Sequence, residues 1–223
     1  MTSCPVVQSC SVGGDKSIEN DHIVGFDHIT FWVGLDCTIF PSFYLKLPRA
    51  TMLIQTSSPL KQVSNAKQVA IFYHKLFGMK PFAYRGLETD SRSVASHVVK
   101  QNKIVFQFES ALEPGNSLYG DYLTKHGDAV KDVALTVVRI EKLVEQIKRS
   151  GGKIVQEVHH VTDKASGNSV KIARVNPYGD FTHTLIERGS GYETPTTGCF
   201  LPNYAPTPLE VSLLLAITLL TPD

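Results

Sequence analysis

The feature that most constrains the fold is a pair of amphipathic helices that recur at a distance along the chain. In the range 65–77 the apolar residues follow the spacing of one helical face, and they are Val69, Phe72, Tyr73 and Leu76. The range 139–151 has the same spacing at Ile140, Leu143, Val144 and Ile147. Asn65 is a good cap for the first helix, and Gly78 and Gly151 are suited to end the two helices. We therefore predict a helix over each range.

Extended segments flank both helices in the same order. One segment precedes the first helix at 26–33, and three follow it at 82–87, 93–100 and 103–108. One precedes the second helix at 131–137, and three follow it at 153–158, 169–175 and 181–187. Asn102 and Gly167 mark tight turns, because both residue types tolerate a positive φ. The chain thus reads as βαβββ twice, which is an internal repeat.

This repeat predicts an α+β fold built from paired βαβββ modules. Each module should form a curved sheet, and the two together should enclose a cavity. Because side chains alternate along a strand, every second residue points into that cavity. The arrangement is similar to the vicinal oxygen chelate, or glyoxalase-like, superfamily, whose paired modules hold a metal in the cup.

Several runs of sequence make a more specific resemblance. They are FDHITFWVG at 26–34, NAKQ at 65–68, FAYRGLET at 82–89, KHGD at 125–128, VKDVA at 130–134, YGDFTHTL at 178–185 and FLPNY at 200–204. Together they resemble 4-hydroxyphenylpyruvate dioxygenases, in order, over 24–34 and 65–204. Runs of this length are poorly explained by chance.

The resemblance implies a known chemistry. Members of that family are Fe(II)-dependent oxidoreductases of tyrosine and phenylalanine catabolism, and they convert the aromatic 2-oxo acid 4-hydroxyphenylpyruvate and O₂ to homogentisate and CO₂. Two His and one carboxylate hold the iron and leave positions open for the keto acid and O₂. The resemblance also implies that these ligands lie in a second pair of modules, beyond Tyr204.

We therefore expect a truncated family member that is inactive alone. The predicted organisation is a flexible amino terminus at 1–22, a vicinal oxygen chelate domain at 23–188, and a linker with an atypical tail at 189–223, the catalytic carboxy-terminal domain being absent. An insert at 35–64 interrupts the first module where the family has a continuous turn. We interpret the insert as translated intron sequence, with a lineage-specific loop as the alternative, and the tail at 205–223 as a misread or alternative exon. Sequencing the transcript distinguishes these interpretations.

The cup itself contains one candidate metal ligand, His28. It lies seven residues before the first helix when 35–64 is left out, and Asp132 has the same place before the second helix. The third position falls at Thr184, whereas His183 and Glu187 alternate onto the opposite face. An imidazole, a carboxylate and a hydroxyl make a poor Fe(II) site. We expect His28 to be a buried, hydrogen-bonded residue, and we assign no catalytic, cofactor-binding or metal-ligating residue to this chain.

Composition excludes several classes of function. A formal net charge of +1 gives no general attraction to nucleic acid or to an anionic membrane. The four cysteines, at 4, 10, 37 and 199, form no C-x-x-C pair, so we expect a reducing, cytoplasmic location. The most apolar stretch, 209–220, is shorter than the roughly 20 residues of a membrane span. No signal peptide is recognisable. We also expect the chain to form a homo-oligomer.

Two other functions remain open at this point. One is a non-catalytic structural or dimerisation fragment, in which the cup is only a packing surface. The other is a stand-alone glyoxalase-like metalloenzyme with a metal at His28 across a dimer. Metal content and O₂ uptake with 4-hydroxyphenylpyruvate discriminate among the three.

Overall fold

The computed structural model describes residues 22–34, 66–113, 116–163, 167–189, 192 and 199–207. The expectations for the amino terminus up to residue 21, for the insert at 35–64, for the Asn65 cap and for the tail from 208 onward concern residues outside these ranges. Within the described ranges, both predicted helices and all eight predicted strands are present. The βαβββ repeat is therefore confirmed.

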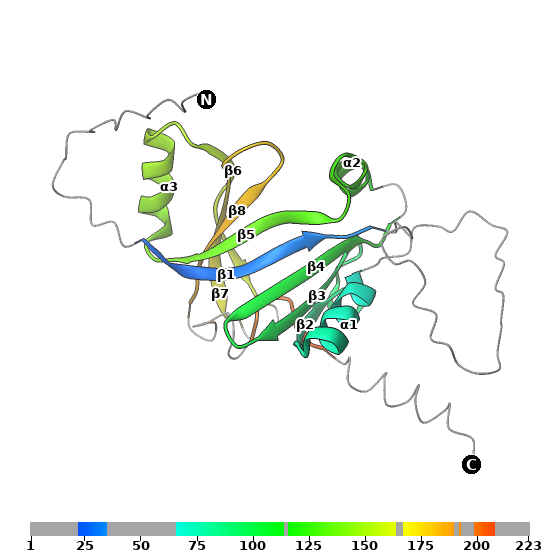
Figure 1. Ribbon diagram of the computed structural model, residues 1–223. Helices are drawn as coiled ribbons and strands as arrows, with labels where there is room; N and C mark the ends of the chain where they lie inside the picture. The colour runs from blue at the N-terminus through cyan, green and yellow to red at the C-terminus, as the bar shows by residue number, and fades with distance from the viewer. Residues whose placement is uncertain are drawn as a thin grey trace, which may run out of the picture.

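The described strands form one nine-stranded sheet (Figure 1). Its centre is the antiparallel pair of β1 (Ile23–Trp32) and β5 (Ala129–Val137). Beyond β1 follow β4 (Ile104–Ala111), β3 (Val94–Gln101), β2 (Lys80–Arg85) and the short β9 (Ala205–Pro206). Beyond β5 follow β8 (Thr182–Glu187), β7 (Ser169–Asn176) and β6 (Lys153–Thr162). In each module the first and fourth strands are parallel neighbours, so the two modules share one strand order.

Each module places its helix between its first and second strands. Figure 1 shows α1 (Ala66–Phe77) and α3 (Ile140–Arg149) at opposite ends of the sheet, with β1 and β5 between them. Ile140, Leu143 and Val144 of α3 are buried, as the periodicity predicts. The glycines after the two helices, Gly78 and Gly151, have positive φ angles of 69° and 81° and end them.

The buried face of α1 differs from the predicted one. Leu76 is 57% exposed, whereas Ala66, Val69 and Ala70 are buried. The two alanines let the helix backbone come close to the sheet, and this rotates the contact face away from Leu76. The periodicity predicted the helix correctly. The side of the helix that packs on the sheet was decided by the two alanines, which are not part of the apolar pattern.

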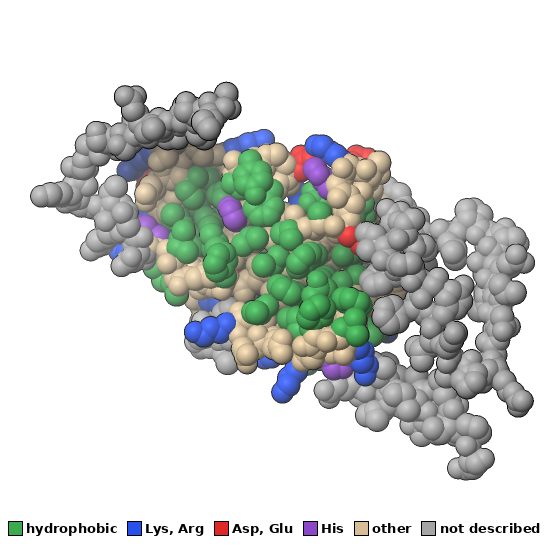
Figure 2. Space-filling model, in the orientation of Figure 1, with side chains coloured by type: hydrophobic (Ala, Val, Ile, Leu, Met, Phe, Trp, Pro, Cys, Tyr) green, Lys and Arg blue, Asp and Glu red, His purple; other side chains and the backbone are tan. Residues whose placement is uncertain are grey.

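Two hydrophobic cores lie between the helices and one face of the sheet. The first joins α1 to β3 and β4 through residues such as Val69, Val99 and Phe108, and the second joins α3 to β5, β7 and β8 through residues such as Leu143, Ala173 and Leu185. Figure 2 shows hydrophobic side chains gathered across the middle of the molecule, over β1, β4 and α1. Since successive side chains of a strand alternate, filling these cores leaves the other set for the opposite face.

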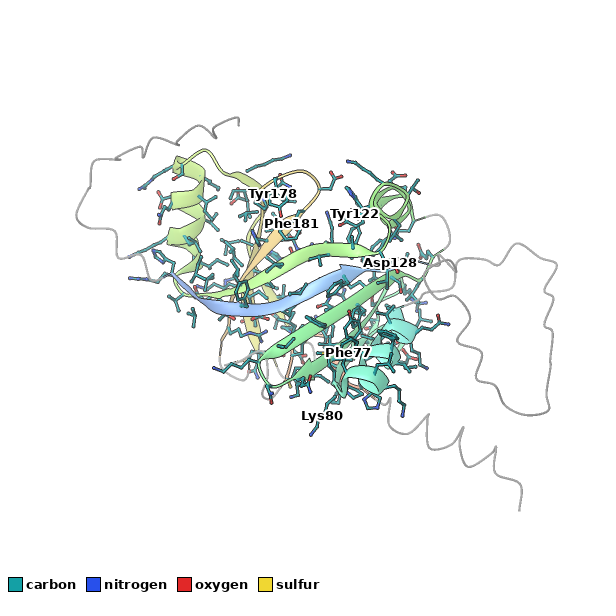
Figure 3. The ribbon with its side chains drawn as sticks, viewed as in Figure 1. Phe77, Lys80, Tyr122, Asp128, Tyr178 and Phe181 are labelled. Atoms are coloured by element: carbon teal, nitrogen blue, oxygen red, sulfur yellow. The ribbon has the colours of Figure 1, made fainter. Side chains whose placement is uncertain are left out.

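Three further elements of the described ranges were not predicted, and the first along the chain is the 3₁₀ helix η1 (Leu87–Thr89) after β2. The helix α2 (Ser117–His126) begins after Asn116, whose side chain accepts a hydrogen bond from the Tyr119 amide at 3.5 Å. Tyr122 and Asp128 anchor the end of α2 (Figure 3): the Tyr122 hydroxyl donates to the Val130 carbonyl at 3.0 Å, and Asp128 accepts from the Gly34 amide at 2.7 Å. Only Tyr119 of α2 is buried, so the helix has no apolar stripe that a sequence search could find.

The third unpredicted element is the strand β9, which belongs to the segment 199–207. Its Ala205 pairs with Tyr84 of β2. Phe200, in the same segment, is 2% exposed and packs against Ala83, Val98 and Val105. This part of the predicted linker region is therefore built into the domain. Among the described helices, none has the length and apolar character needed to cross a membrane.

Candidate functional site

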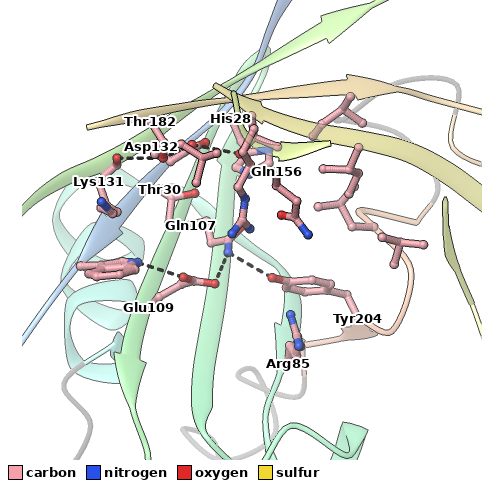
Figure 4. A pocket seen from close by; sticks show the side chains of 18 of the residues that line it. His28, Thr30, Arg85, Gln107, Glu109, Lys131, Asp132, Gln156, Thr182 and Tyr204 are labelled. Atoms are coloured by element: carbon pink, nitrogen blue, oxygen red, sulfur yellow. Dashed lines mark hydrogen bonds between the residues drawn. The ribbon is translucent and has the colours of Figure 1, made fainter. Parts of the chain in front are cut away.

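The face of the sheet opposite the two cores lines a cavity of about 440 Å³ (Figure 4). Both modules contribute to it. His28, Thr30 and Trp32 come from β1, and Asp132 comes from β5. The walls are completed by side chains of β2, α2, β4, β6, β7 and β8 and by Leu201, Pro202 and Tyr204. The predicted cup between the modules is therefore present.

A half-buried carboxylate, that of Glu109 on β4, organises the wall of the first module. Its Oε2 accepts hydrogen bonds from the Trp32 indole at 3.1 Å and the Tyr119 hydroxyl at 3.0 Å. Its Oε1 accepts from the Ser96 hydroxyl at 2.8 Å and the Gln107 amide at 2.6 Å. Burial, together with the charge of Glu109, raises the pKa of Tyr119 far above its usual value, so this phenol stays a donor. Four donors thus satisfy a carboxylate that no sequence pattern indicated.

Gln107 links Glu109 to Tyr204 of the carboxy-terminal segment. Its Nε2 also donates to the Tyr204 hydroxyl oxygen at 3.0 Å (Figure 4). Because a carboxylate can only accept, the contact with Glu109 fixes which end of the amide is nitrogen. The Oε1 of Gln107 is buried and has no hydrogen-bond partner among the described residues. Burial, then the nearby charge of Glu109, raises the pKa of Tyr204 to about 12.

His28 is buried, with 6% of its surface exposed, and its Nδ1 lies 2.7 Å from Oδ1 of Asp27. Asp27 is the extra residue of a β-bulge, since Phe26 and His28 face successive residues of β5. The His28 imidazole also contacts an aromatic ring. The Phe200 ring lies edge-on to it, with 4.9 Å between the two ring centroids. The carboxylate beside Nδ1 accepts a hydrogen bond from this nitrogen, which is therefore the donor.

Asp27 also binds Arg188, which follows β8. The guanidinium donates through Nε and Nη2, both at 2.7 Å, and the Thr136 hydroxyl adds a third donor at 2.8 Å. Burial acts to raise the pKa of Asp27, but the hydrogen bonds from His28 and Arg188 outweigh it and hold the pKa well below its usual value. Arg188 also donates to the Phe200 carbonyl at 2.7 Å. This cluster joins β1, β8 and the segment 199–207.

The structure brings the three expected ligand positions, His28, Asp132 and Thr184, to the same cavity. It does not arrange them as a ligand set. Oδ1 of Asp132 accepts hydrogen bonds from the hydroxyls of Thr182 at 2.5 Å and Thr184 at 2.9 Å. Each threonine hydroxyl therefore donates its proton to the Asp132 carboxylate. The side chains do not direct their lone pairs toward one shared metal position.

A metal of the implied kind does not fit the described residues. Fe(II) in the two-His, one-carboxylate pattern needs a second imidazole near His28. Within the described ranges, no group of three or more His, Cys, Asp or Glu side chains could hold a metal ion. His183 binds the Val133 carbonyl at 3.0 Å and Glu187 accepts from the Ile140 amide at 2.7 Å, and neither of them lines the cavity.

Three cationic side chains line the cavity: Arg85, Lys131 and Arg174. Lys131 donates to the Asp180 carbonyl and lies over the Trp32 ring, 5.1 Å from its centroid. Burial lowers the pKa of Lys131. Arg85 lies 5.9 Å from the centroid of the Tyr204 ring. Arg174 comes from β7, where it pairs with Thr184.

No protein-family model matches the chain. Curated relatives do: the chain is 41% identical over 191 residues to the 4-hydroxyphenylpyruvate dioxygenase of Danio rerio, which covers 86% of this chain and 39% of the relative. It is 46% identical over 147 residues to the protein of that name from Caenorhabditis briggsae, covering 66% of this chain and 36% of the relative. The chain thus spans less than two fifths of the length of these relatives.

Two solved structures share the fold. A mutant of 4-hydroxymandelate synthase from Streptomyces coelicolor superimposes with a TM-score of 0.57 at 16% identity, over 84% of this chain and 43% of the other. Methylmalonyl-CoA epimerase from Mycobacterium tuberculosis superimposes with a TM-score of 0.50 at 14% identity, over 78% of this chain and 94% of the other. At such identities the likeness concerns the fold alone, which is that of the vicinal oxygen chelate proteins.

Proposed function

We propose that this chain is the amino-terminal part of a 4-hydroxyphenylpyruvate dioxygenase, contributing a cup that does not hold the iron. The main support is the 41% identity over 191 residues to a protein of that name. The fold of paired βαβββ modules agrees with it. The reaction of the complete protein would be the conversion of 4-hydroxyphenylpyruvate and O₂ to homogentisate and CO₂.

The proposal assigns the iron to residues other than those of the described cup. In support, the Glu109 carboxylate, which lines the cup, is engaged by four protein donors, and Asp27, beside His28, is engaged by three residues. Two imidazoles line the cup, His28 and His159, and Asp132 is held by two threonine hydroxyls, but no group of three possible metal ligands is found among the described residues. We therefore propose that this chain alone neither binds stoichiometric iron nor turns over the keto acid.

A structural role is the second candidate, and one observation favours it. The sheet and α1 carry large apolar side chains that are exposed, among them Phe26 at 78%, Phe77 at 57% and Ile104 at 53%. Exposed apolar surface of this kind promotes association. We propose that the chain forms homo-oligomers, which light scattering after size exclusion would test. The proposed compartment is the cytosol, and the proposed domain comprises 23–188 with the 199–207 segment packed on it.

Metal analysis and O₂ uptake test the proposed function together. The purified chain would be incubated anaerobically with Fe(II), desalted, and analysed for iron and for O₂ consumption with 4-hydroxyphenylpyruvate. The Danio rerio dioxygenase, treated identically, is the positive control. We expect substoichiometric iron and no substrate-dependent O₂ uptake by the chain. One iron per chain with turnover would refute the assignment of the cup as non-catalytic.

A further inference from the structure

The carboxy-terminal end of α1 presents apolar side chains that stay largely exposed. Leu76 and Phe77 lie in its last turn, and each is 57% exposed. The buried residues of α1, which are Ala66, Val69 and Ala70, all lie in the first half of the helix. Figure 2 shows hydrophobic side chains gathered over α1 and the neighbouring β4. Exposed apolar surface of this kind marks a docking site, and we call Leu76 and Phe77 the α1 end surface.

The direction of β9 brings the chain toward this surface. β9 is antiparallel to β2, with Ala205 opposite Tyr84 and Pro206 opposite Ala83. The chain therefore leaves β9 in the direction of Lys80, where β2 begins. Lys80 follows closely after the end of α1, and Figure 3 shows Phe77 and Lys80 at the same end of the domain. The described chain thus stops at Thr207 on a course toward the α1 end surface.

The sequence that continues from Thr207 carries the signals of a helix. Thr207 and Glu210 have the spacing of a capping box, in which a Thr side chain caps the helix and a Glu three residues later reaches back. Pro208 stands at the first helical position, which suits its fixed φ. The sequence therefore predicts a helix over 208–220, about 20 Å long. One of its faces would consist of Leu209, Leu213, Ile217 and Leu220.

The Thr207 side chain supplies a structural observation that agrees with this prediction. Its Oγ1 is buried and has no hydrogen-bond partner among the described residues. Buried polar atoms in folded proteins are nearly always paired. As a helix cap, this oxygen would accept a hydrogen bond from the backbone amide of Glu210. Such a donor belongs to the same chain, so it reaches a buried oxygen without any opening to solvent.

The charges at the end of α1 also suit the segment that follows Thr207. The range 208–223 contains Glu210 and Asp223 and has no Lys or Arg. Lys75 lies in the last turn of α1, and Lys80 and Lys100 face each other in β2 and β3. Burial, together with the charge of Lys80, lowers the pKa of Lys100. An acidic segment is therefore attracted to this end of the domain.

We infer that the segment 208–220 forms a helix, capped by Thr207, which docks its apolar face on the α1 end surface. The occupant is the segment of the same chain, because the covalent link at Thr207 gives it a high effective concentration beside that surface. Phe26 and Ile104 stay outside this contact and remain for the association proposed above. The inference holds whether or not the proposed dioxygenase assignment is correct.

Hydrogen exchange of the full chain tests the inference. Exchange of the backbone amides at 211–220 would be followed by mass spectrometry, with a synthetic peptide of the same sequence as the reference. We expect exchange about tenfold slower, or more, in the chain than in the peptide. The protection should be the same when the chain is diluted tenfold, as for any contact within one molecule. Absence of protection, or protection that is lost on dilution and so belongs to a second copy, would overturn the inference.

Matched leucine variants locate the contact. Leu76→Ser should speed the exchange of 211–220 by about tenfold, since it removes apolar surface from the contact. Leu87→Ser is the control: Leu87 is 60% exposed and follows the opposite end of β2, so the exchange should not change. The amides of β3, which packs beneath α1, would show that both variants stay folded. Unchanged exchange in Leu76→Ser, or an equal acceleration in both variants, would contradict docking at the end of α1.

Variants of Thr207 test the cap separately. Thr207→Val keeps the shape of the side chain but removes the hydroxyl, and should speed the exchange of 211–214 by about fivefold. Thr207→Ser keeps the hydroxyl and should behave like the parent chain. Equal exchange in the Val and Ser variants would show that Thr207 does not cap a helix.

Discussion

The two modules have the same backbone and different interiors. The pairing of β1 with β5 is reciprocal, since His28 faces Ala134 and Thr30 faces Asp132. This makes His28 equivalent to Asp132, as the spacing before each helix predicts. The same correspondence relates β4 to β8. Glu109 pairs with Trp32 in the first module, and Ile186 pairs with Thr136 at the matching place in the second.

The inward-facing residues therefore diverged while the outward-facing ones stayed apolar. On the outer face each strand must fill the space beneath a helix, and this demands Val, Leu, Phe or Ala in both modules. On the inner face some side chains pack in a smaller apolar cluster around Tyr192, but the others border the cavity and can be polar. A carboxylate with four donors and an isoleucine occupy matching places because each is satisfied by its own neighbours.

Breaking the junction of the modules should give the largest effect. Asp27→Asn removes the charge that the Arg188 guanidinium binds, and breaking a buried ion pair of this kind costs about 3–5 kcal/mol of unfolding free energy. Urea unfolding at neutral pH measures the loss. The control is Glu145→Asn, in the exposed pair with Arg149, which should change stability by less than about 0.5 kcal/mol.

The pH dependence of stability should show the same contact. The pKa of Asp27 is lowered in the folded chain, so its contribution is fully present above the unfolded value of about 4. As the pH falls below about 4, the unfolded chain takes up the proton first, and stability declines. The free energy of unfolding of the Asp27→Asn variant should change less with pH across this range. If the free energy of unfolding of the variant fell with decreasing pH as steeply as that of the parent chain, Asp27 would not contribute to the acid dependence of stability.

Exchanging the matching inner residues sharpens the comparison. Glu109→Ile gives the first module the residue of the second, and leaves the donors on Trp32, Tyr119 and Ser96 unpaired. We expect a loss of about 3 kcal/mol, measured by urea unfolding. Glu109→Gln keeps an acceptor and should lose less. A stable Glu109→Ile variant would show that the inner face tolerates either side chain without its neighbours.

Truncating apolar side chains on the outer face should destabilise the two modules by similar amounts. Leu143→Ala under α3 should cost about 2–3 kcal/mol, and Val69→Ala under α1 about 1–2 kcal/mol, according to the methyl groups removed. Leu76→Ala, at an exposed position of α1, is the control and should cost less than about 0.5 kcal/mol. A large loss at Leu76 would contradict the observed orientation of α1.

The smallest effect is expected at the surface. Asp180 accepts hydrogen bonds from Lys125 at 2.6 Å and His126 at 2.9 Å, which lower its pKa to about 2. Because these groups are exposed, Asp180→Asn should reduce the midpoint of thermal unfolding only slightly, and high salt should abolish the difference. A difference that persists in high salt would indicate that the contact is not merely electrostatic.

The sequence by itself determined the two helices, the eight strands of the repeat and the side of α3 that packs, because these follow from local periodicity. It also identified which strands carry His28, Asp132 and Thr184. Only the tertiary structure decided the partners of the inner residues. Trp32 and Glu109 are 77 residues apart, Gln107 and Tyr204 are 97 apart, and Asp27 and Arg188 are 161 apart.

The physical reason is that alternation fixes the face of a side chain but not its neighbours across the sheet. Strand order and register bring those neighbours together, and both depend on how the two modules join at β1 and β5. The same holds for α2 and β9, whose short segments have little apolar pattern of their own and are held by contacts with strands distant in the sequence.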